Sequence, residues 1–319
     1  MANGGIIGPV QTVTSNTAVN RTTAFTSSGD FTAQAGTKEV DYLMVGGGGG
    51  GSNAQCRAQG GGGGGGLITS FPGGTKTAVP PSGVLAVVIG GGGSSGPASD
   101  SAAGTMTNGV NTTFNCLTAG GGGKGNGTSS LGSGGGGPSY LNGPGQSGGP
   151  QGNNGGNGNC NSNTPVSGSY TFVAGGGGGA GGVGGNGTNP GGTVTSGAGG
   201  AVATNAITGS TVSYAGGGSG AAQRFDPNPK GVAIGAATPT SGLGQMFGGA
   251  AAGAGSANTG GGGGGGTSTN PTSPRNATGG AGGSGHVVIR EYANTFRTAP
   301  GVWDMNTVYD NVKNGNWTN

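Results

Sequence analysis

The sequence predicts a mostly β and irregular fold: a bundle, or sandwich, of polyglycine II helices with short β-strands, plus one short C-terminal α-helix. Three observations lead to this prediction. Glycine supplies 90 of the 319 residues, only 29% of the residues are hydrophobic, and short apolar segments run directly into glycine runs. So few large side chains cannot build an ordinary apolar core, and backbone groups must therefore provide much of the cohesion.

The first expected strands lie in residues 22–43, where apolar and polar residues alternate and predict a hairpin around AGTKE, residues 35–39. Five apolar segments then lead into glycine runs, and we expect a short strand in each. They are YLMV (42–45), VLAVVI (84–89), FNCLTA (114–119), SYTFVA (169–174) and VSYA (212–215). Two seven-glycine runs, 60–66 and 260–266, lack such a lead, and HVVIREY (286–292) is expected as a closing strand.

The glycine runs have three interpretations. Flexible linkers are typical of isolated Gly/Ser runs, but no domains large enough to be joined lie between these runs. Disordered chains normally combine low hydrophobicity with high net charge, and this chain has low hydrophobicity without high net charge. Disorder is therefore less favoured, but it stays open as an alternative. The third interpretation is the extended polyglycine II helix, with three residues per turn and no internal hydrogen bonds. Several such helices side by side can pair every N–H and C=O group, provided that no Cβ separates the backbones.

Both ends of the chain differ from the centre. Residues 1–21 are polar around a GGIIGP kernel and are expected to form an attachment arm, with a disordered leader as the alternative. Residues 22–292 form the predicted glycine-rich domain. Residues 293–319 contain the expected helix, with Asp304 as N-cap, Trp303 and Val308 as a hydrophobic staple, and Gly315 as the stop. This helix docks either on the glycine-rich domain or on a neighbouring subunit.

Composition excludes several function classes. The net charge of +3 is too small for a nucleic-acid footprint. We expect no membrane insertion and no signal peptide, because no apolar stretch approaches 18 residues. The three cysteines lack metal-site or paired spacing and are expected as free, mostly buried thiols. Neither a metal nor a cofactor is expected.

Catalytic chemistry is not expected either, so the chain is predicted not to be an enzyme. His286 is the single histidine and starts a predicted strand, where a structural role is expected. The stretch GGGGKGNGTSS resembles a phosphate loop, but Gly125 follows Lys124 where that loop needs Ser or Thr.

Recognition is better supported by the residues. Arg224, Phe225, Asp226 and Lys230 bring a planar cation, an aromatic ring and a carboxylate together within seven residues of a Pro-rich turn. Tyr140, in GGGGPSYLNGPG, is a second candidate contact. Such groups bind sugars or protein loops by stacking and hydrogen bonding. The alternative is that Phe225 and Tyr140 pack over glycine backbones.

Four segments carry a resemblance to a known family. EVDYLMVGGGGGGS (39–52), VSYAGGGSG (212–220), ANTGGGGGG (257–265) and GGAGGSGHVVIREY (279–292) resemble, in wording and in order, the glycine-rich domain of bacteriophage tail fibres and related virion appendages. The closing strand of that family usually reads GIVIIRY, so His286 and Glu291 are departures. The segment VWDMNTVYDNVKNGNW (302–317) is similar to short terminal motifs of marine-phage virion proteins.

The resemblance implies a sandwich of polyglycine II helices whose distal loops contact the host. We therefore expect a virion protein, made in the host cytoplasm, that acts as tail fibre or fibre tip. Its expected partners are other virion proteins, through the N-terminal arm, and a host cell-surface receptor, either a glycan or an outer-membrane protein. Fibres of this kind are often trimeric, whereas tip domains can be monomeric, so this chain is expected to be either a homotrimer or a monomer. The alternatives are a capsid-bound fibre or head decoration protein, and an ice-binding glycine-rich protein, which needs a regular tripeptide spacing that we expect to be absent.

Overall fold

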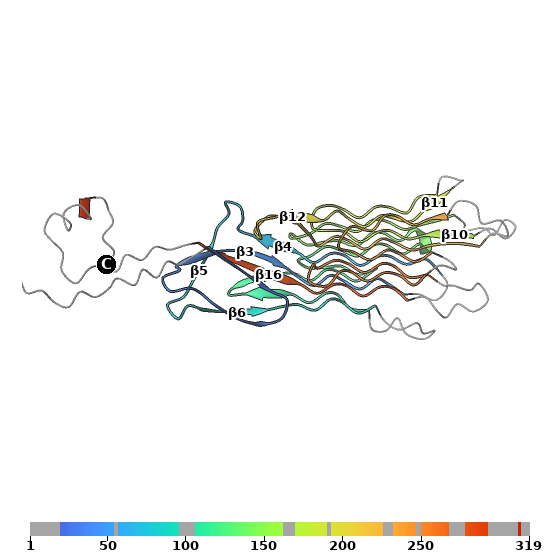
Figure 1. Ribbon diagram of the computed structural model, residues 1–319. Helices are drawn as coiled ribbons and strands as arrows, with labels where there is room; N and C mark the ends of the chain where they lie inside the picture. Colours follow the sequence, from blue (N-terminus) through green and yellow to red (C-terminus); the bar gives the residue numbers. More distant parts are fainter. Residues whose placement is uncertain are drawn as a thin grey trace, which may run out of the picture.

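The computed structural model describes residues 20–53, 57–95, 106–161, 170–189, 193–225, 232–246, 250–267, 278–292 and 312–313. These residues form an elongated molecule of short strands and extended glycine segments (Figure 1). Strands β3, β5, β6 and β16 gather at one end, here called the base. Strands β10 and β11 lie at the opposite end, here called the tip, and the glycine segments run side by side between the two. The predicted mostly β and irregular fold is confirmed.

Two packed sheets build the base. The first has the order β1-β16-β3-β4, with β5 also paired to β3, and the second has the order β2-β6-β7-β8. The strands of the first sheet are β1 (Arg21–Phe25), β3 (Glu39–Val45), β4 (Leu67–Thr69), β5 (Thr77–Ala78) and β16 (His286–Glu291). Those of the second are β2 (Gly29–Thr32), β6 (Val84–Val88), β7 (Thr112–Phe114) and β8 (Leu117–Ala119).

The first sheet is covered on both faces. Met44 and Val287 pack against Phe31 and Phe114 of the second sheet. On the opposite face, Leu43, Val45 and Val288 pack against Ile207 and Tyr214, which belong to the hairpin of β12 (Ala203–Asn205) and β13 (Val212–Tyr214). Burial on both faces explains why YLMV and HVVI are continuously apolar and do not alternate.

Two local predictions about the base are wrong. The expected hairpin around residues 35–39 does not form, because β2 pairs with β6 whereas β1 and β3 both pair with β16. The segment FNCLTA is two strands, β7 and β8, joined by a turn in which Asn115 has φ 54°. Cys116 lies in this turn and is exposed, and Cys160 is half-buried, so the expectation of mostly buried thiols does not hold for these two cysteines.

The glycine run 60–66 shows how the bundle is held together. Its N–H groups point in turn to three neighbouring segments: Gly61 and Gly64 donate to residues 175 and 178, Gly62 and Gly65 to 263 and 260, and Gly63 and Gly66 to 123 and 120. Its carbonyl groups accept from three others, at residues 46–52, at 133–136 and at 218. The donors repeat every three residues and six segments surround the run, which is the packing of polyglycine II helices.

Close approach makes glycine necessary in this run. A Cβ added to Gly62 would lie 2.1 Å from the carbonyl oxygen of Gly49, and one added to Gly63 would lie 2.2 Å from that of Ser133. Both obstacles are backbone atoms, so a side-chain rotation cannot relieve the overlap. Positions 62 and 63 therefore admit no other residue type without separating the segments.

Asparagine side chains satisfy N–H groups where the bundle has no further segment. The Oδ1 atoms of Asn108 and Asn111 accept hydrogen bonds from the N–H groups of Lys124 and Gly121. Asn154 and Asn157 accept in the same way from Gly148 and Gly145. The members of each pair are three residues apart, which is the period of the helix that they cover.

Short elements also form at the tip. A three-stranded sheet has the order β14-β10-β9, and β11 pairs in parallel with β15. Their bounds are β9 (Asn159–Asn161), β10 (Tyr170–Val173), β11 (Val194–Thr195), β14 (Ala222–Phe225) and β15 (Val232–Ala233). A 3-10 turn, η1, spans Tyr140–Asn142. The predicted C-terminal helix lies outside the described residues except for Val312 and Lys313, which have helical backbone.

Candidate functional site

Of the sequence-predicted contact residues, the structure places Tyr140 and the backbone of Arg224 and Phe225 at the tip. Tyr140 begins η1 and is 50% exposed. Arg224 and Phe225 lie on β14, which pairs with β10 so that Thr171 is opposite Arg224. The side chains of Arg224 and Phe225 fall outside the described residues, as do Asp226 and Lys230 entirely. The site as described therefore consists of Tyr140 and the strands that lead to the other four candidates.

Arg57 is the residue that joins these elements, and the sequence reasoning missed it. Its guanidinium carbon lies 3.8 Å from the centroid of the Tyr140 ring and 5.6 Å from that of Phe172, on β10. Arg57 is the single charged residue between Asp41 and Lys76. A lone charge in the short turn between two glycine runs was the available signal.

Phe172 belongs to the face of the tip sheet that packs on the bundle. It contacts a cluster of Ala58, Ala174 and Ala221, all fully buried. In the register of the sheet, Phe172 lies between Cys160 of β9 and Gln223 of β14. Phe172 is thus held in place by the small residues beneath it, and it fixes the position of Arg57 above.

Gln223 is unusual among the tip residues. Its side chain is fully buried, and neither Nε2 nor Oε1 has a hydrogen-bond partner among the described residues. Burying an amide without a partner costs about 1–3 kcal/mol. Gln223 therefore does not contribute to stability through hydrogen bonding in this arrangement.

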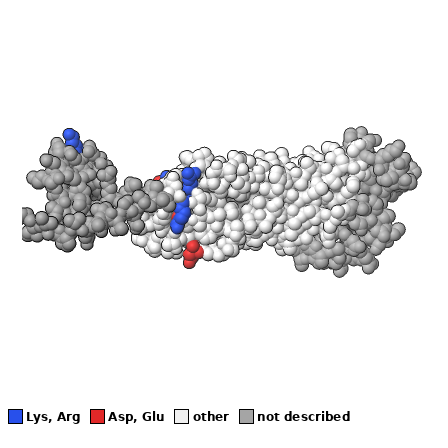
Figure 2. All heavy atoms as spheres, in the orientation of Figure 1, with Lys and Arg blue, Asp and Glu red and all other residues white. Residues whose placement is uncertain are grey.

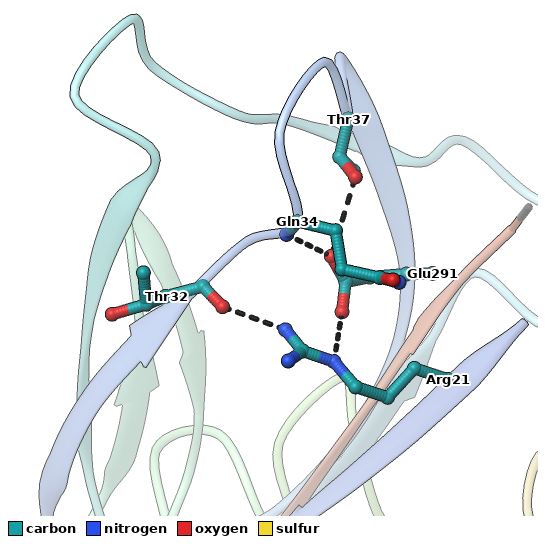
Figure 3. A network of polar contacts seen from close by, with 5 residues as sticks. All are labelled: Arg21, Thr32, Gln34, Thr37 and Glu291. Carbon is teal, nitrogen blue, oxygen red and sulfur yellow. Dashed lines mark hydrogen bonds and ion pairs between the residues drawn. The ribbon is translucent and has the colours of Figure 1, made fainter. Parts of the chain in front are cut away.

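The base contains a buried carboxylate network centred on Glu291 (Figure 3). Glu291, fully buried at the end of β16, accepts from Arg21 Nε at 2.5 Å, from the Gln34 N–H at 2.6 Å and from Thr37 Oγ1 at 3.2 Å. Arg21 also donates through Nη2 to the carbonyl oxygen of Thr32 at 2.6 Å. Glu291 departs from the family pattern, and here it links β1, β2 and β16.

Most of the described charged residues lie at the base, as Figure 2 shows for one face of the molecule. Lys76 pairs with Glu39 at 3.0 Å and also lies 4.7 Å from the Tyr292 ring. The Tyr292 hydroxyl donates to Asp41 at 2.5 Å. This hydrogen bond, together with burial and the charge of Asp41, raises the pKa of Tyr292 above its ordinary value. The base thus contains two described ion pairs, Arg21 with Glu291 and Lys76 with Glu39.

His286 has a packing role. Its ring stacks on Tyr214 with centroids 6.1 Å apart, and burial lowers the pKa of the imidazole. Its Nδ1 atom has no hydrogen-bond partner among the described residues. Within the part of the chain that the structure describes, no three His, Cys, Asp or Glu side chains are grouped so that they could hold a metal ion.

No helix in the described part of the chain has the length and apolarity needed to cross a membrane. In comparison with known families, residues 23–292 match the family described as a glycine-rich domain. A search of curated proteins finds no match.

Proposed function

Because the chain belongs to the glycine-rich domain family, we propose that it is a structural protein of a bacteriophage virion: a tail fibre or fibre tip that recognises the host receptor. The observation that carries the proposal is the separation of the two ends of the molecule. Strands β1 and β16, which adjoin the terminal segments, lie at the base, whereas β10, β14 and η1 lie at the tip (Figure 1). A domain of this shape can be attached by one end and present the other.

The proposal assigns a role to each part of the chain. Residues 1–21 attach the protein to another virion protein, and the base, with its paired charges, adjoins that attachment. Tyr140, Arg224, Phe225, Asp226 and Lys230 are the proposed receptor contacts, with a glycan or an outer-membrane protein as the partner. The protein is made in the host cytoplasm and assembled into the particle, as a homotrimer or a monomer.

Labelling of intact particles tests the location. Antibodies against the tip, coupled to gold and imaged by electron microscopy, are expected to bind at the end of the tail. Labelling of the head would instead support the capsid-bound alternative, and particles without label would contradict both.

Adsorption tests the recognition role. The purified protein is expected to bind host cells and to reduce phage adsorption by competition, while a variant in which Arg224, Phe225, Asp226 and Lys230 are replaced by serine binds less. Unchanged binding by this variant would remove these four residues from the contact surface. Deletion of residues 1–19, which keeps Arg21 in β1 and its ion pair with Glu291, is expected to abolish incorporation into particles without changing binding by the purified protein.

One observation bears on the ice-binding alternative. Ala251, Ala254 and Ala257 are exposed and three residues apart, so a tripeptide spacing does occur in one segment. The neighbouring segment, which accepts a hydrogen bond from Gly253, carries Leu243 and Met246, 49% and 41% exposed. These large side chains interrupt a flat surface, which favours the virion role. A thermal hysteresis assay distinguishes the two, and we expect no activity.

A further inference from the structure

Arg57 at the tip has donors that the described residues do not use. Its guanidinium group is in contact with the rings of Tyr140 and Phe172, and it forms no ion pair or hydrogen bond with any described residue. The guanidinium group carries five N–H donors in one plane and remains charged at any pH relevant to a protein. Ring contacts occupy the face of this plane and leave the donors at its edge.

No described carboxylate lies near to neutralise Arg57. The described acidic residues are Asp30, Glu39, Asp41 and Glu291, all on β2, β3 or β16 at the base. The next charged residue on the bundle, Lys124, is also basic, and it precedes Gly125, which packs against Ser52 and Gly60 close to Arg57 in the chain. The described charge towards the tip is therefore positive.

The two rings give Arg57 a fixed orientation. Tyr140 comes from η1 and Phe172 from β10, so the guanidinium group is held by two elements that are distant in sequence. Holding a long side chain in advance reduces the conformational entropy lost when a ligand binds. Tyr140 is half exposed, so its ring also offers apolar surface beside the charged group.

We propose that Arg57 and Tyr140 form a binding site for an oxyanion, a phosphate or a carboxylate, carried by a surface saccharide. The two oxygens of the anion accept from the edge of the guanidinium group in a bidentate manner, which is the geometry that arginine favours. The sugar ring that carries the anion packs beside Tyr140. This inference rests on the proposed receptor-recognition function and names the chemical class of the receptor group.

Binding of small saccharides to the full-length protein tests the site. The probes are glucose 1-phosphate and glucuronate, with neutral glucose as the comparison, and the method is isothermal titration calorimetry at low salt. We expect the two anionic sugars to bind at least tenfold more tightly than glucose. Equal affinity for anionic and neutral sugars, or no binding of the anionic ones, would overturn the proposal.

Three variants locate the binding. Arg57→Gln is expected to remove the preference for anionic sugars. Arg57→Lys keeps the charge and the ring contact but loses the bidentate fork, so its affinity for the anionic sugars should fall about fivefold or more. Lys124→Gln is the matched control and should stay within twofold of the wild type. Wild-type affinity in Arg57→Gln, or an equal loss in Lys124→Gln and Arg57→Gln, would refute a site built on Arg57.

A measurement of thermal stability for each variant separates a binding role from a packing role. If Arg57→Lys has wild-type stability and weaker anion binding, the loss is in recognition. If the wild-type protein adsorbs to host cells but does not prefer anionic sugars, the oxyanion site is wrong and the receptor role stands. If it prefers anionic sugars but neither adsorbs nor occurs in particles, the receptor role is wrong and the site stands.

Discussion

Substitution of Gly62 by alanine tests the physical basis of the fold. The N–H group of Gly62 donates to Gly263 at 2.8 Å, and its carbonyl oxygen accepts from Gly218 at 2.9 Å. The added Cβ would lie 2.1 Å from the carbonyl oxygen of Gly49, whereas ordinary contact begins at 3.4 Å. The segments 46–51 and 60–66 must therefore separate locally by more than 1 Å.

The expected loss follows from the bonds that this separation stretches. Gly49 donates to Gly63 at 2.8 Å, and an increase of more than 1 Å takes this pair beyond hydrogen-bonding distance. A buried donor or acceptor left without a partner costs about 1–3 kcal/mol. With one pair broken and adjacent bonds weakened, we expect the free energy of unfolding to fall by about 2–5 kcal/mol.

Gly91→Ala is the matched control. Gly91 belongs to the run 90–93, but it is exposed and a Cβ there would meet nothing within 4 Å. Its substitution should change the free energy of unfolding by less than about 1 kcal/mol. The change should be an increase, because alanine has less conformational freedom than glycine in the unfolded chain. Urea unfolding followed by pulse proteolysis measures both variants. A Gly62→Ala protein as stable as Gly91→Ala would refute the conclusion that close backbone packing holds the bundle together.

Three further predictions concern buried polar groups. Glu291→Gln should lower the free energy of unfolding by about 1–3 kcal/mol, because the buried partner of Arg21 loses its charge. Glu39→Gln, at an exposed ion pair, should lower it by less than about 1 kcal/mol. Equal losses of the two variants in urea unfolding would contradict this difference. Burial lowers the folded-state pKa of His286 below its ordinary value of 6.5. As the pH falls through 6.5, the unfolded state therefore binds more protons than the folded state, and the free energy of unfolding should decrease from about pH 7 to pH 5. His286→Phe should reduce this decrease, and an unchanged pH profile would argue against it. Gln223→Met removes a buried amide without a described partner, so its melting temperature should equal or exceed that of the wild type, and a clear decrease would indicate a hydrogen-bonding role.

The predictable part of the fold is the part encoded in continuous segments. YLMV and HVVIREY are strands because their apolar side chains are buried when these segments pair in a sheet. The glycine runs are bundled because their backbone N–H and C=O groups need partners. The pairing itself could not be predicted. Strand β1 pairs with β16, from Arg21 opposite Glu291, and no local pattern identifies a partner so distant in sequence.

The spacing of the asparagine pairs is visible in the sequence, but their role could not be predicted from it. Asn108 with Asn111, and Asn154 with Asn157, show the three-residue spacing in the printed sequence. Their meaning depends on knowing which segments lack an outer neighbour, and that requires the three-dimensional arrangement.

The candidate site, like the fold, could be predicted from the sequence only in part. Tyr140 could be selected because it is an isolated large aromatic residue in a glycine-rich stretch. Arg57 could not be weighed without Tyr140 and Phe172 beside it, since each of the three comes from a different segment. Whether Arg224, Phe225, Asp226 and Lys230 join them stays a prediction.

The three-residue repeat of donors in the run 60–66 limits how such a chain can change in length. One inserted residue would turn every following N–H group by a third of a revolution, so that each would address the wrong neighbour. Three residues inserted into each of the adjoining segments would restore every partner and lengthen the rod by about 9 Å. Evolution or design could thus adjust the reach of this protein in triplet steps while the base and the tip keep their own sequences.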